Sequence, residues 1–255
     1  MFSTDSRPHF HPHRVYPRRT RLVMGASRIA GVTEALVRWA PRIALNTTPS
    51  ISEDPGTVEV LSTRLVVCGI PRSGTTYLSR AAEMFLAGDG AVWKSHDPFV
   101  GRDFLPRGIP VIITLRPPLE HAIAKAIFHE DPVTPASLAR RLALITAWYR
   151  LMAREPRHEL LRAWDFSDII SDPDYVLRTT LRQSSAAPID SAAVENHVGD
   201  DDARREVASP HTHIPHADRA QLRAHYENFV EDAKVCRYLA LTLEAQERVR
   251  QNHST

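Results

Sequence analysis

The clearest chemical pattern in the sequence is the segment GIPRSGTT, residues 69–76. Two glycines frame a short loop that carries a cation at Arg72 and ends on the hydroxyl donors Thr75 and Thr76. A glycine-rich turn that leads into a helix directs several backbone N–H groups at one point, where the helix dipole also favours negative charge. In loops that bind Mg²⁺–triphosphates a lysine follows the last glycine, and Thr75 stands in its place here. The segment therefore predicts an anion site suited to a 5′-phosphate or a phosphosulfate.

A lysine and a histidine lie two residues apart in the segment WKSHDPF, residues 93–99. If WKSH is a short strand, Lys94 and His96 share one of its faces, because side chains in a strand repeat every two residues. A histidine has the acidity to accept a proton from a reacting group near neutral pH. Taken alone, His96 is one of 13 histidines and is also compatible with an ordinary surface or core position, and Lys94 with a solvated charge.

The segments around these residues resemble the sulfotransferases that use 3′-phosphoadenosine 5′-phosphosulfate as sulfuryl donor. PRSGTT is similar to that family's 5′-phosphosulfate loop, and WKSH to the Lys-Thr-His that contributes its catalytic histidine. Residues 111–131 resemble the strand and helix that hold the donor's 3′-phosphate, and residues 164–181 resemble the segment Tyr-Glu-Asp-Leu-x-x-Asp-Pro. The four segments follow in the family's order over about half of the chain.

The resemblance implies transfer of a sulfuryl group from this donor, as co-substrate and without a metal, to a hydroxyl or amine of a small-molecule acceptor. It implies that His96 is the general base, that Lys94 reaches the sulfuryl oxygens and that Arg72 neutralises the leaving phosphate. Arg116 ends an apolar strand, where an arginine needs a partner, and the resemblance assigns it the 3′-phosphate. The other donor-binding residues that it implies are Ser73, Gly74, Thr75, Thr76, Tyr77 and Phe166.

Several aromatic residues stay open between a ligand-binding role and a place in the core. Phe166 matches a position that can stack on adenine, and an ordinary core position is the alternative. An acceptor pocket and the core are the alternatives for three others: Trp93, Phe99 and Trp164.

The sequence departs from the family at the 3′-phosphate. A serine eight residues after the arginine is Ala124 here, and the family's late Arg-Lys-Gly loop is absent. Arg204 and Arg205 are hypothetical replacements for that loop. The 3′ end of the donor is therefore expected to depend mainly on Arg116.

Two other functions compete with sulfuryl transfer. The first is a P-loop nucleoside or small-molecule kinase, and the second is a non-catalytic nucleotide-binding relative. The histidine-rich segment SPHTHIPH, residues 209–216, resembles a zinc site in its spacing, but a flexible loop that covers the acceptor is favoured because no further ligand completes the set.

The elements that must position these residues alternate between strands and helices. Short apolar runs predict four strands within LVVCGI, AVWK, IPVIITLR and LLRAWDF, and helical spacing predicts helices after the loop and over residues 136–153. This order predicts an α/β fold of the three-layer P-loop type, with a mostly parallel central sheet flanked by helices. The expected organisation is a flexible basic tail (1–21) and one domain (22–255), which contains an N-terminal helix (22–45), a core (63–182), a variable loop (185–216) and C-terminal helices (217–250).

Composition narrows the class of protein. A hydrophobic share of 43%, a charged share of 24% and a net charge of +2 are ordinary for a soluble globular chain, and they favour neither nucleic acid nor a membrane as partner. Cys68 and Cys236 both lie in apolar runs and are expected as reduced core residues, which favours the cytoplasm. Oligomeric state is left open.

Overall fold

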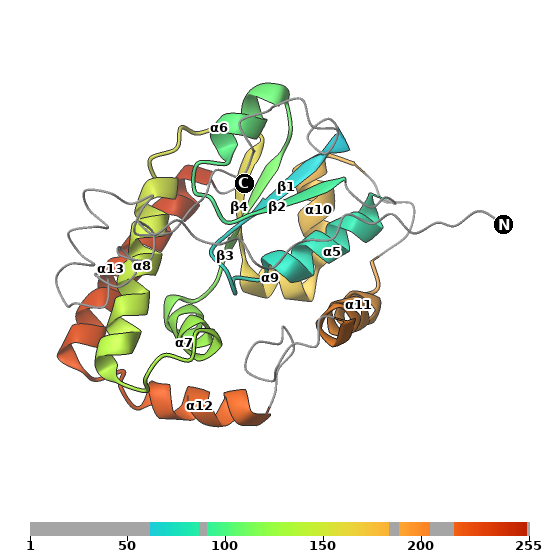
Figure 1. Ribbon diagram of the computed structural model, residues 1–255. Coiled ribbons are helices and arrows are strands. Elements are labelled where there is room, and N and C mark those ends of the chain that lie inside the picture. Colours follow the sequence, from blue (N-terminus) through green and yellow to red (C-terminus); the bar gives the residue numbers. More distant parts are fainter. Residues whose placement is uncertain (1–61, 87–90, 184–188, 205–216, 254–255) are drawn as a thin grey trace, which may run out of the picture.

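Four short strands form one parallel sheet at the centre of the computed structural model, which describes residues 62–86, 91–183, 189–204 and 217–253 (Figure 1). In chain order the strands are β1 (Leu65–Cys68), β2 (Val92–Ser95), β3 (Val111–Leu115) and β4 (Leu161–Asp165). Their order in the sheet is β2-β1-β3-β4, and every pairing is parallel. The expected tail (1–21), N-terminal helix (22–45) and histidine-rich segment (209–216) lie outside the described residues.

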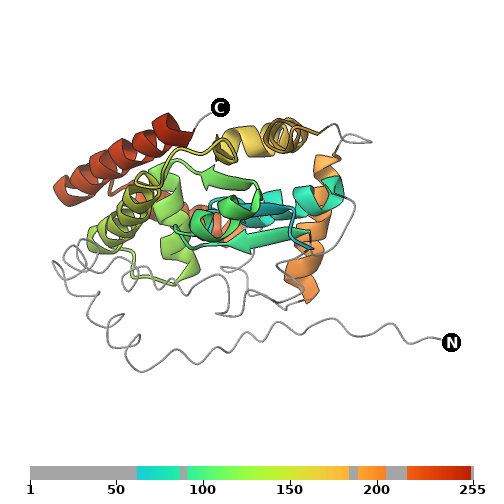
Figure 2. The same cartoon turned by 90° about the horizontal axis from the view of Figure 1, so that it is seen from above.

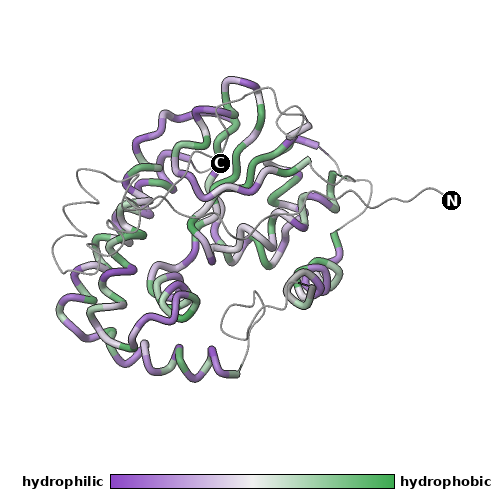
Figure 3. Tube along the Cα trace, viewed as in Figure 1, coloured by the Kyte–Doolittle hydropathy of each residue, from purple (hydrophilic) through white to green (hydrophobic). Residues whose placement is uncertain are grey.

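The strands form because their apolar residues are buried on both faces of the sheet. All residues of β1 and β3 are buried, as expected for the central strands of a parallel sheet. Val66 and Ile113 face one hydrophobic core, and Val67 and Ile112 face the other. Hydrophobic residues follow the strands and the inner faces of the helices (Figure 3).

Helices cover both faces of the sheet, so the molecule has three layers (Figure 2). The first core joins the sheet to α7 (Pro118–Phe128), α8 (Pro135–Met152) and α13 (Ala233–His253). The second core joins it to α5 (Thr75–Phe85), α10 (Pro173–Leu181) and α11 (Ser191–Arg204). The remaining helices are α6 (Gly101–Phe104), the 3₁₀ turn η1 (Leu105–Arg107), α9 (Phe166–Ser171) and α12 (Ala217–Glu227). This architecture confirms the predicted α/β fold.

The topology creates a crevice at the carboxyl edge of the sheet. The chain leaves β1 into α5 on one face and leaves β3 into α7 on the other. Neighbouring parallel strands whose connections lead to opposite faces leave a gap between their loops, where ligands of α/β proteins bind.

Two sequence predictions need correction. Residues 191–204, expected within a variable loop, form α11, whose Val194 is buried against α5. Cys236 is exposed rather than in the core, because it lies in the first turn of α13 on the side that faces away from the sheet, with its Sγ 2.9 Å from the carbonyl oxygen of Val230. Cys68 is buried as predicted. Among the described helices, none has both the length and the hydrophobicity needed to cross a membrane.

Candidate functional site

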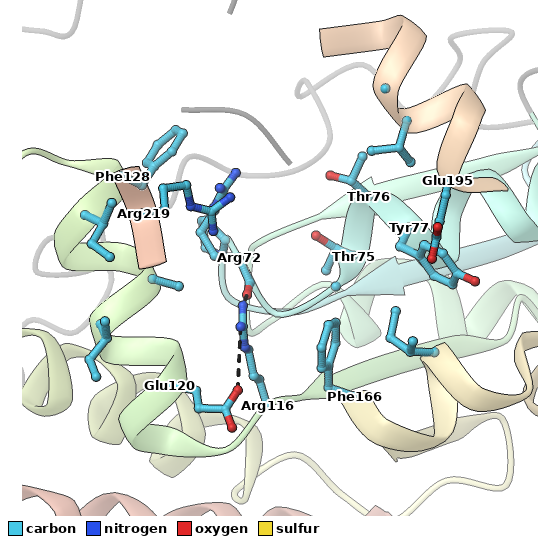
Figure 4. Close-up of a pocket in the computed structure, with 18 of the residues that line it drawn as sticks. Arg72, Thr75, Thr76, Tyr77, Arg116, Glu120, Phe128, Phe166, Glu195 and Arg219 are labelled. Carbon is cyan, nitrogen blue, oxygen red and sulfur yellow. Dashed lines mark hydrogen bonds and ion pairs between the residues drawn. The ribbon is translucent and has the colours of Figure 1, made fainter. Parts of the chain in front are cut away.

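A cavity of about 1130 Å³ opens at the carboxyl edge of the sheet, between α5, α7, α9, α11 and α12 (Figure 4). The glycine loop begins at Gly69, immediately after β1. A predicted site residue comes immediately after each of the other strands: His96 after β2, Arg116 after β3 and Phe166 after β4. The predicted site residues that line the cavity are Arg72, Gly74, Thr75, Thr76, Tyr77, Lys94, His96, Arg116 and Phe166.

The loop after β1 requires glycine at two positions. A side chain at Gly69 would place its Cβ 2.1 Å from Oγ1 of Thr114. Gly74 has φ 94° and begins α5, and a Cβ there would lie 2.7 Å from the ring of Phe166. Because Gly74 has no capping side chain and the first turn of α5 has no acidic residue, no side-chain carboxylate of that turn competes for an anion at this helix terminus.

Ser73 is the one predicted loop residue that does not line the cavity. Its hydroxyl is buried and lies 2.6 Å from Oγ1 of Thr114, and its N–H donates to the carbonyl oxygen of Ile70 at 3.1 Å. In this structure the Ser73 hydroxyl therefore points away from the cavity, and binding of the donor by Ser73 stays a prediction. Ser73 instead ties the loop to β3.

The loop backbone is also held from the side of α7. His121 is fully buried and its Nε2 donates to the carbonyl oxygen of Pro71 at 3.0 Å, while Nη1 of Arg116 donates to the carbonyl oxygen of Arg72 at 2.9 Å. Arg72 has φ 76°, a left-handed conformation that is uncommon outside glycine and that marks functional loops. Its guanidinium lies over the ring of Phe128, 4.8 Å from the ring centroid.

The geometry around His96 determines its tautomer. Nδ1 of His96 lies 2.5 Å from the carbonyl oxygen of Gly69. Because a carbonyl oxygen can only accept, Nδ1 carries the hydrogen and Nε2 is the basic nitrogen. Burial lowers the pKa of His96 to about 4, and the nearby positive charges of Lys94 and Lys125 act in the same direction. The indole nitrogen of Trp148 donates to the His96 carbonyl oxygen at 3.0 Å and fixes the backbone.

Lys94 connects β2 to the phosphate loop. Its ammonium donates to Oγ1 of Thr76 at 3.2 Å, and its side chain is exposed at the cavity. Lys94 and His96, two residues apart around the end of β2, thus both reach the cavity that the loop lines.

Arg116 and Phe166 lie against each other below the loop. The Arg116 guanidinium is 4.9 Å from the centroid of the Phe166 ring, and Gln246 of α13 donates to the Arg116 carbonyl oxygen at 2.8 Å. Burial lowers the pKa of Arg116, and Arg219 and Arg223 add to this effect, whereas Glu120 opposes it. Phe166 both supports a cation and closes over Gly74, so it lines the site rather than only filling the core.

Sequence reasoning missed several residues that line the cavity: Glu120, Phe128, Glu195, Arg219 and Arg223. Glu120 follows Arg116 by four residues, and Arg219 precedes Arg223 by four, which are spacings that put side chains on one helical face. Arg204, the proposed substitute for the missing clamp, ends α11, and Arg205 lies outside the described residues. Ala124 lines the cavity where the family has serine.

The other aromatic candidates pack within the protein and do not line this cavity. Trp164 is buried, with its indole nitrogen donating to Thr180 at 3.1 Å. Trp93 packs against the first core, next to Phe104. The guanidinium of Arg102 lies over the ring of Phe99 at 4.5 Å from its centroid.

Comparison with protein-family models gives no match, and comparison with curated protein sequences gives no significant match. One cavity combines a glycine loop at a helix terminus, four arginines, a lysine and a neutral histidine with a defined basic nitrogen. Such a set can hold an anionic group and accept a proton next to it.

Proposed function

We propose that this protein is a sulfotransferase, which moves a sulfuryl group from 3′-phosphoadenosine 5′-phosphosulfate to a hydroxyl or amine of a small-molecule acceptor. The observation that carries the proposal is the position of His96. Its Nδ1 bonds to the carbonyl oxygen of Gly69, the residue that opens the phosphate loop, so the base and the anion site are parts of one hydrogen-bonded unit.

The reaction would proceed by in-line displacement. The acceptor oxygen forms a bond to sulfur while the bond between sulfur and the 5′-phosphate oxygen breaks. The acceptor proton passes to Nε2 of His96, and the leaving bisphosphate takes the electron pair. Lys94, which donates to Thr76 beside the loop, would offset the charge of the sulfuryl oxygens. Arg72 and the N–H groups of the loop would offset the charge of the leaving phosphate.

The low pKa of His96 bears on the timing of proton transfer. A base with a pKa of about 4 is neutral at pH 7 but too weak to deprotonate a free alcohol. Proton transfer would therefore accompany formation of the sulfur–oxygen bond, when the acceptor oxygen becomes acidic. This chemistry requires no metal ion.

The reduced, buried thiol of Cys68 supports a cytoplasmic site of action, because the cytoplasm keeps thiols reduced. Acceptors in that compartment are metabolites, and the closest test candidates are phenols, alcohols, sugars and amines.

Ligand-dependent thermal unfolding tests the proposal against its rivals. Adenosine 3′,5′-bisphosphate is expected to raise the melting temperature more than ATP–Mg²⁺ does, because a ligand that binds only the folded state stabilises it. Stabilisation by ATP–Mg²⁺ alone would instead favour a P-loop kinase. Turnover of labelled donor with the acceptor panel then separates an enzyme from a non-catalytic nucleotide-binding relative.

A further inference from the structure

The backbone of Arg116 is held from behind the cavity by two buried side chains. Arg116 lies one residue beyond Leu115, the last residue of β3 that pairs with β4. Nε2 of Gln246 on α13 donates to the carbonyl oxygen of Arg116 at 2.8 Å, across 130 residues of sequence, and to the hydroxyl of Tyr149 on α8 at 3.1 Å. The Tyr149 hydroxyl also bonds to the backbone of Arg116. Two helices outside the cavity therefore fix the backbone of a residue that lines it.

The orientation of the Gln246 amide is set from both sides. Its Nε2 faces a carbonyl oxygen, which can only accept, while its Oε1 accepts from Nη2 of Arg250 at 3.3 Å. Arg250 in turn makes two bonds to the carboxylate of Asp165, at 2.6 and 3.1 Å. Because Asp165 is the last residue of β4, this network joins the ends of β3 and β4 to α13.

A glutamine is an unexpected residue on the inner face of α13. Gln246 is 1% exposed, and Thr242, Ala245 and Val249 on the same face are also buried. Burying a glutamine costs side-chain entropy and requires partners for its polar atoms. A methionine of similar size would pack α13 against the protein without these costs. The bonds that the amide makes, above all the one to Arg116, therefore explain the glutamine.

Arg116 transmits this constraint to the glycine loop. Its Nη1 donates to the carbonyl oxygen of Arg72 at 2.9 Å, and Figure 4 shows the Arg116 side chain reaching the backbone of the loop. Arg72 has φ 76°, a left-handed conformation that persists only where the surrounding structure holds it. A chain of hydrogen bonds thus runs from α13 through Arg116 to the loop residue with the least usual backbone.

We propose that Gln246 is a positioning residue of the anion site. It does not line the cavity, but it holds Arg116, and through Arg116 the backbone of Arg72, in the conformation in which the loop binds its anion. The identity of that anion rests on the proposed function. α13 therefore sets the affinity of a loop that it does not touch.

Calorimetric titration of adenosine 3′,5′-bisphosphate into the full chain tests the proposal with two variants. Q246M keeps the size of the side chain and removes its donor, so it should weaken binding about 3- to 10-fold. The matched control is T242V, which removes a buried hydroxyl of α13 that lies 2.8 Å from Oγ1 of Thr146 on α8. T242V should lower the melting temperature and leave the affinity within about twofold of the wild type.

Two results of the titration would overturn the proposal. One is wild-type affinity in Q246M. The other is an equal loss of affinity in T242V, because general loosening of α13 against α8 would then explain both variants. Amide NMR spectra of the ligand-free proteins add a direct reading of the loop. The resonances of Arg72, Ser73 and Gly74 should shift in Q246M and stay in place in T242V.

Tyr149→Phe decides the proposal if Q246M does not fold. It removes the other side-chain bond to the Arg116 backbone, so it should shift the same loop resonances and weaken binding about 2- to 5-fold. Unchanged loop resonances and unchanged affinity in this variant would count against positioning by α8 and α13.

Failure of the proposed function gives a different result. If the wild-type chain does not bind adenosine 3′,5′-bisphosphate, the anion assigned to the loop is wrong. The ligand-free spectra then still decide on Gln246, because they report the loop without any nucleotide. Loop resonances that shift in Q246M and not in T242V support the positioning role, and loop resonances that stay in place in Q246M overturn it.

Discussion

The geometry of His96 predicts that two substitutions will separate its structural role from its catalytic role. In His96→Asn the amide nitrogen, attached to Cγ as Nδ1 is, can keep the hydrogen bond to the carbonyl oxygen of Gly69, but the basic Nε2 is lost. In His96→Ala both are lost, and the carbonyl oxygen of buried Gly69 loses its donor. An unsatisfied buried polar group costs about 1–3 kcal/mol, so only the alanine variant should be clearly destabilised.

Turnover should fall in both variants by about 10²- to 10⁴-fold, the usual contribution of a general base. In His96→Asn, donor affinity should stay within about threefold of the wild type, because this variant keeps the loop intact. The assay is turnover of labelled donor with an acceptor found by screening, together with calorimetric binding of adenosine 3′,5′-bisphosphate. The control is His225→Asn, which changes an exposed histidine of α12 that does not line the cavity.

The pH profile adds a test of the environment of His96. Because burial lowers its pKa to about 4, Nε2 stays unprotonated down to that pH. We therefore expect kcat/KM for the donor to stay constant from pH 8 down to about 5. It should fall only below that pH, where His96 becomes protonated. Wild-type turnover in His96→Asn would refute the role as base. A fall in kcat/KM with a midpoint near pH 6.5, present in the wild type and absent from His96→Asn, would refute the buried, neutral state of His96.

Three further predictions concern the loop and the fold. Gly74→Ala should abolish nucleotide binding and destabilise the protein by about 1–3 kcal/mol, because a φ of 94° is strained for alanine and its Cβ would meet Phe166. The control is Gly108→Ala, which has φ 72° and no atom within 4 Å of its Cβ, so chemical denaturation of this variant gives the cost of backbone strain alone. Ser73→Ala should cost about 1 kcal/mol, because it removes the short hydrogen bond of the Thr114 hydroxyl and leaves that hydroxyl only its 3.5 Å bond to the carbonyl oxygen of Cys68. A double-mutant cycle with Thr114→Val should recover part of this cost, and additivity would exclude the coupling. The unfolding free energy should fall as the pH drops from about 6.5 to about 4, because the unfolded chain takes up protons at His96 and at the other histidines whose pKa is lowered by burial, His121, His129 and His253, before the folded chain does. His96 should contribute roughly 3 kcal/mol of this loss, which is the part that His96→Asn lacks at matched pH.

The part of the site that could be predicted from sequence is the part that follows strands directly. His96, Arg116 and Phe166 each come one residue after a strand, and the glycine loop begins one residue after another. In a parallel sheet the carboxyl ends of all strands lie at one edge, so correct strand prediction alone brings these residues together. Local apolar runs are enough to predict such strands.

Residues that depend on side-chain packing were harder to predict. Ser73 has the same polarity as its neighbours in the loop, and only the position of Thr114 on β3 explains why its hydroxyl points away from the cavity. Cys236 lies in an apolar run, but one side of a surface helix is exposed whatever its neighbours in sequence are. In both cases the deciding partner or surface is distant in the chain.

The arginines of α12 illustrate a long-range dependence that still leaves a signal in the sequence. Arg223 lies more than one hundred residues after Arg116, and nothing local indicates that the two meet. Yet the pattern Arg-x-x-x-Arg-x-x-Tyr puts two cations on the same face as an aromatic residue that is more often buried than exposed. A surface helix normally turns its cations away from its buried face. Arginines that share the face of a buried tyrosine must therefore either pair with acids or face a cavity, and here both arginines line the cavity while Arg223 also pairs with Glu227 at 2.7 Å.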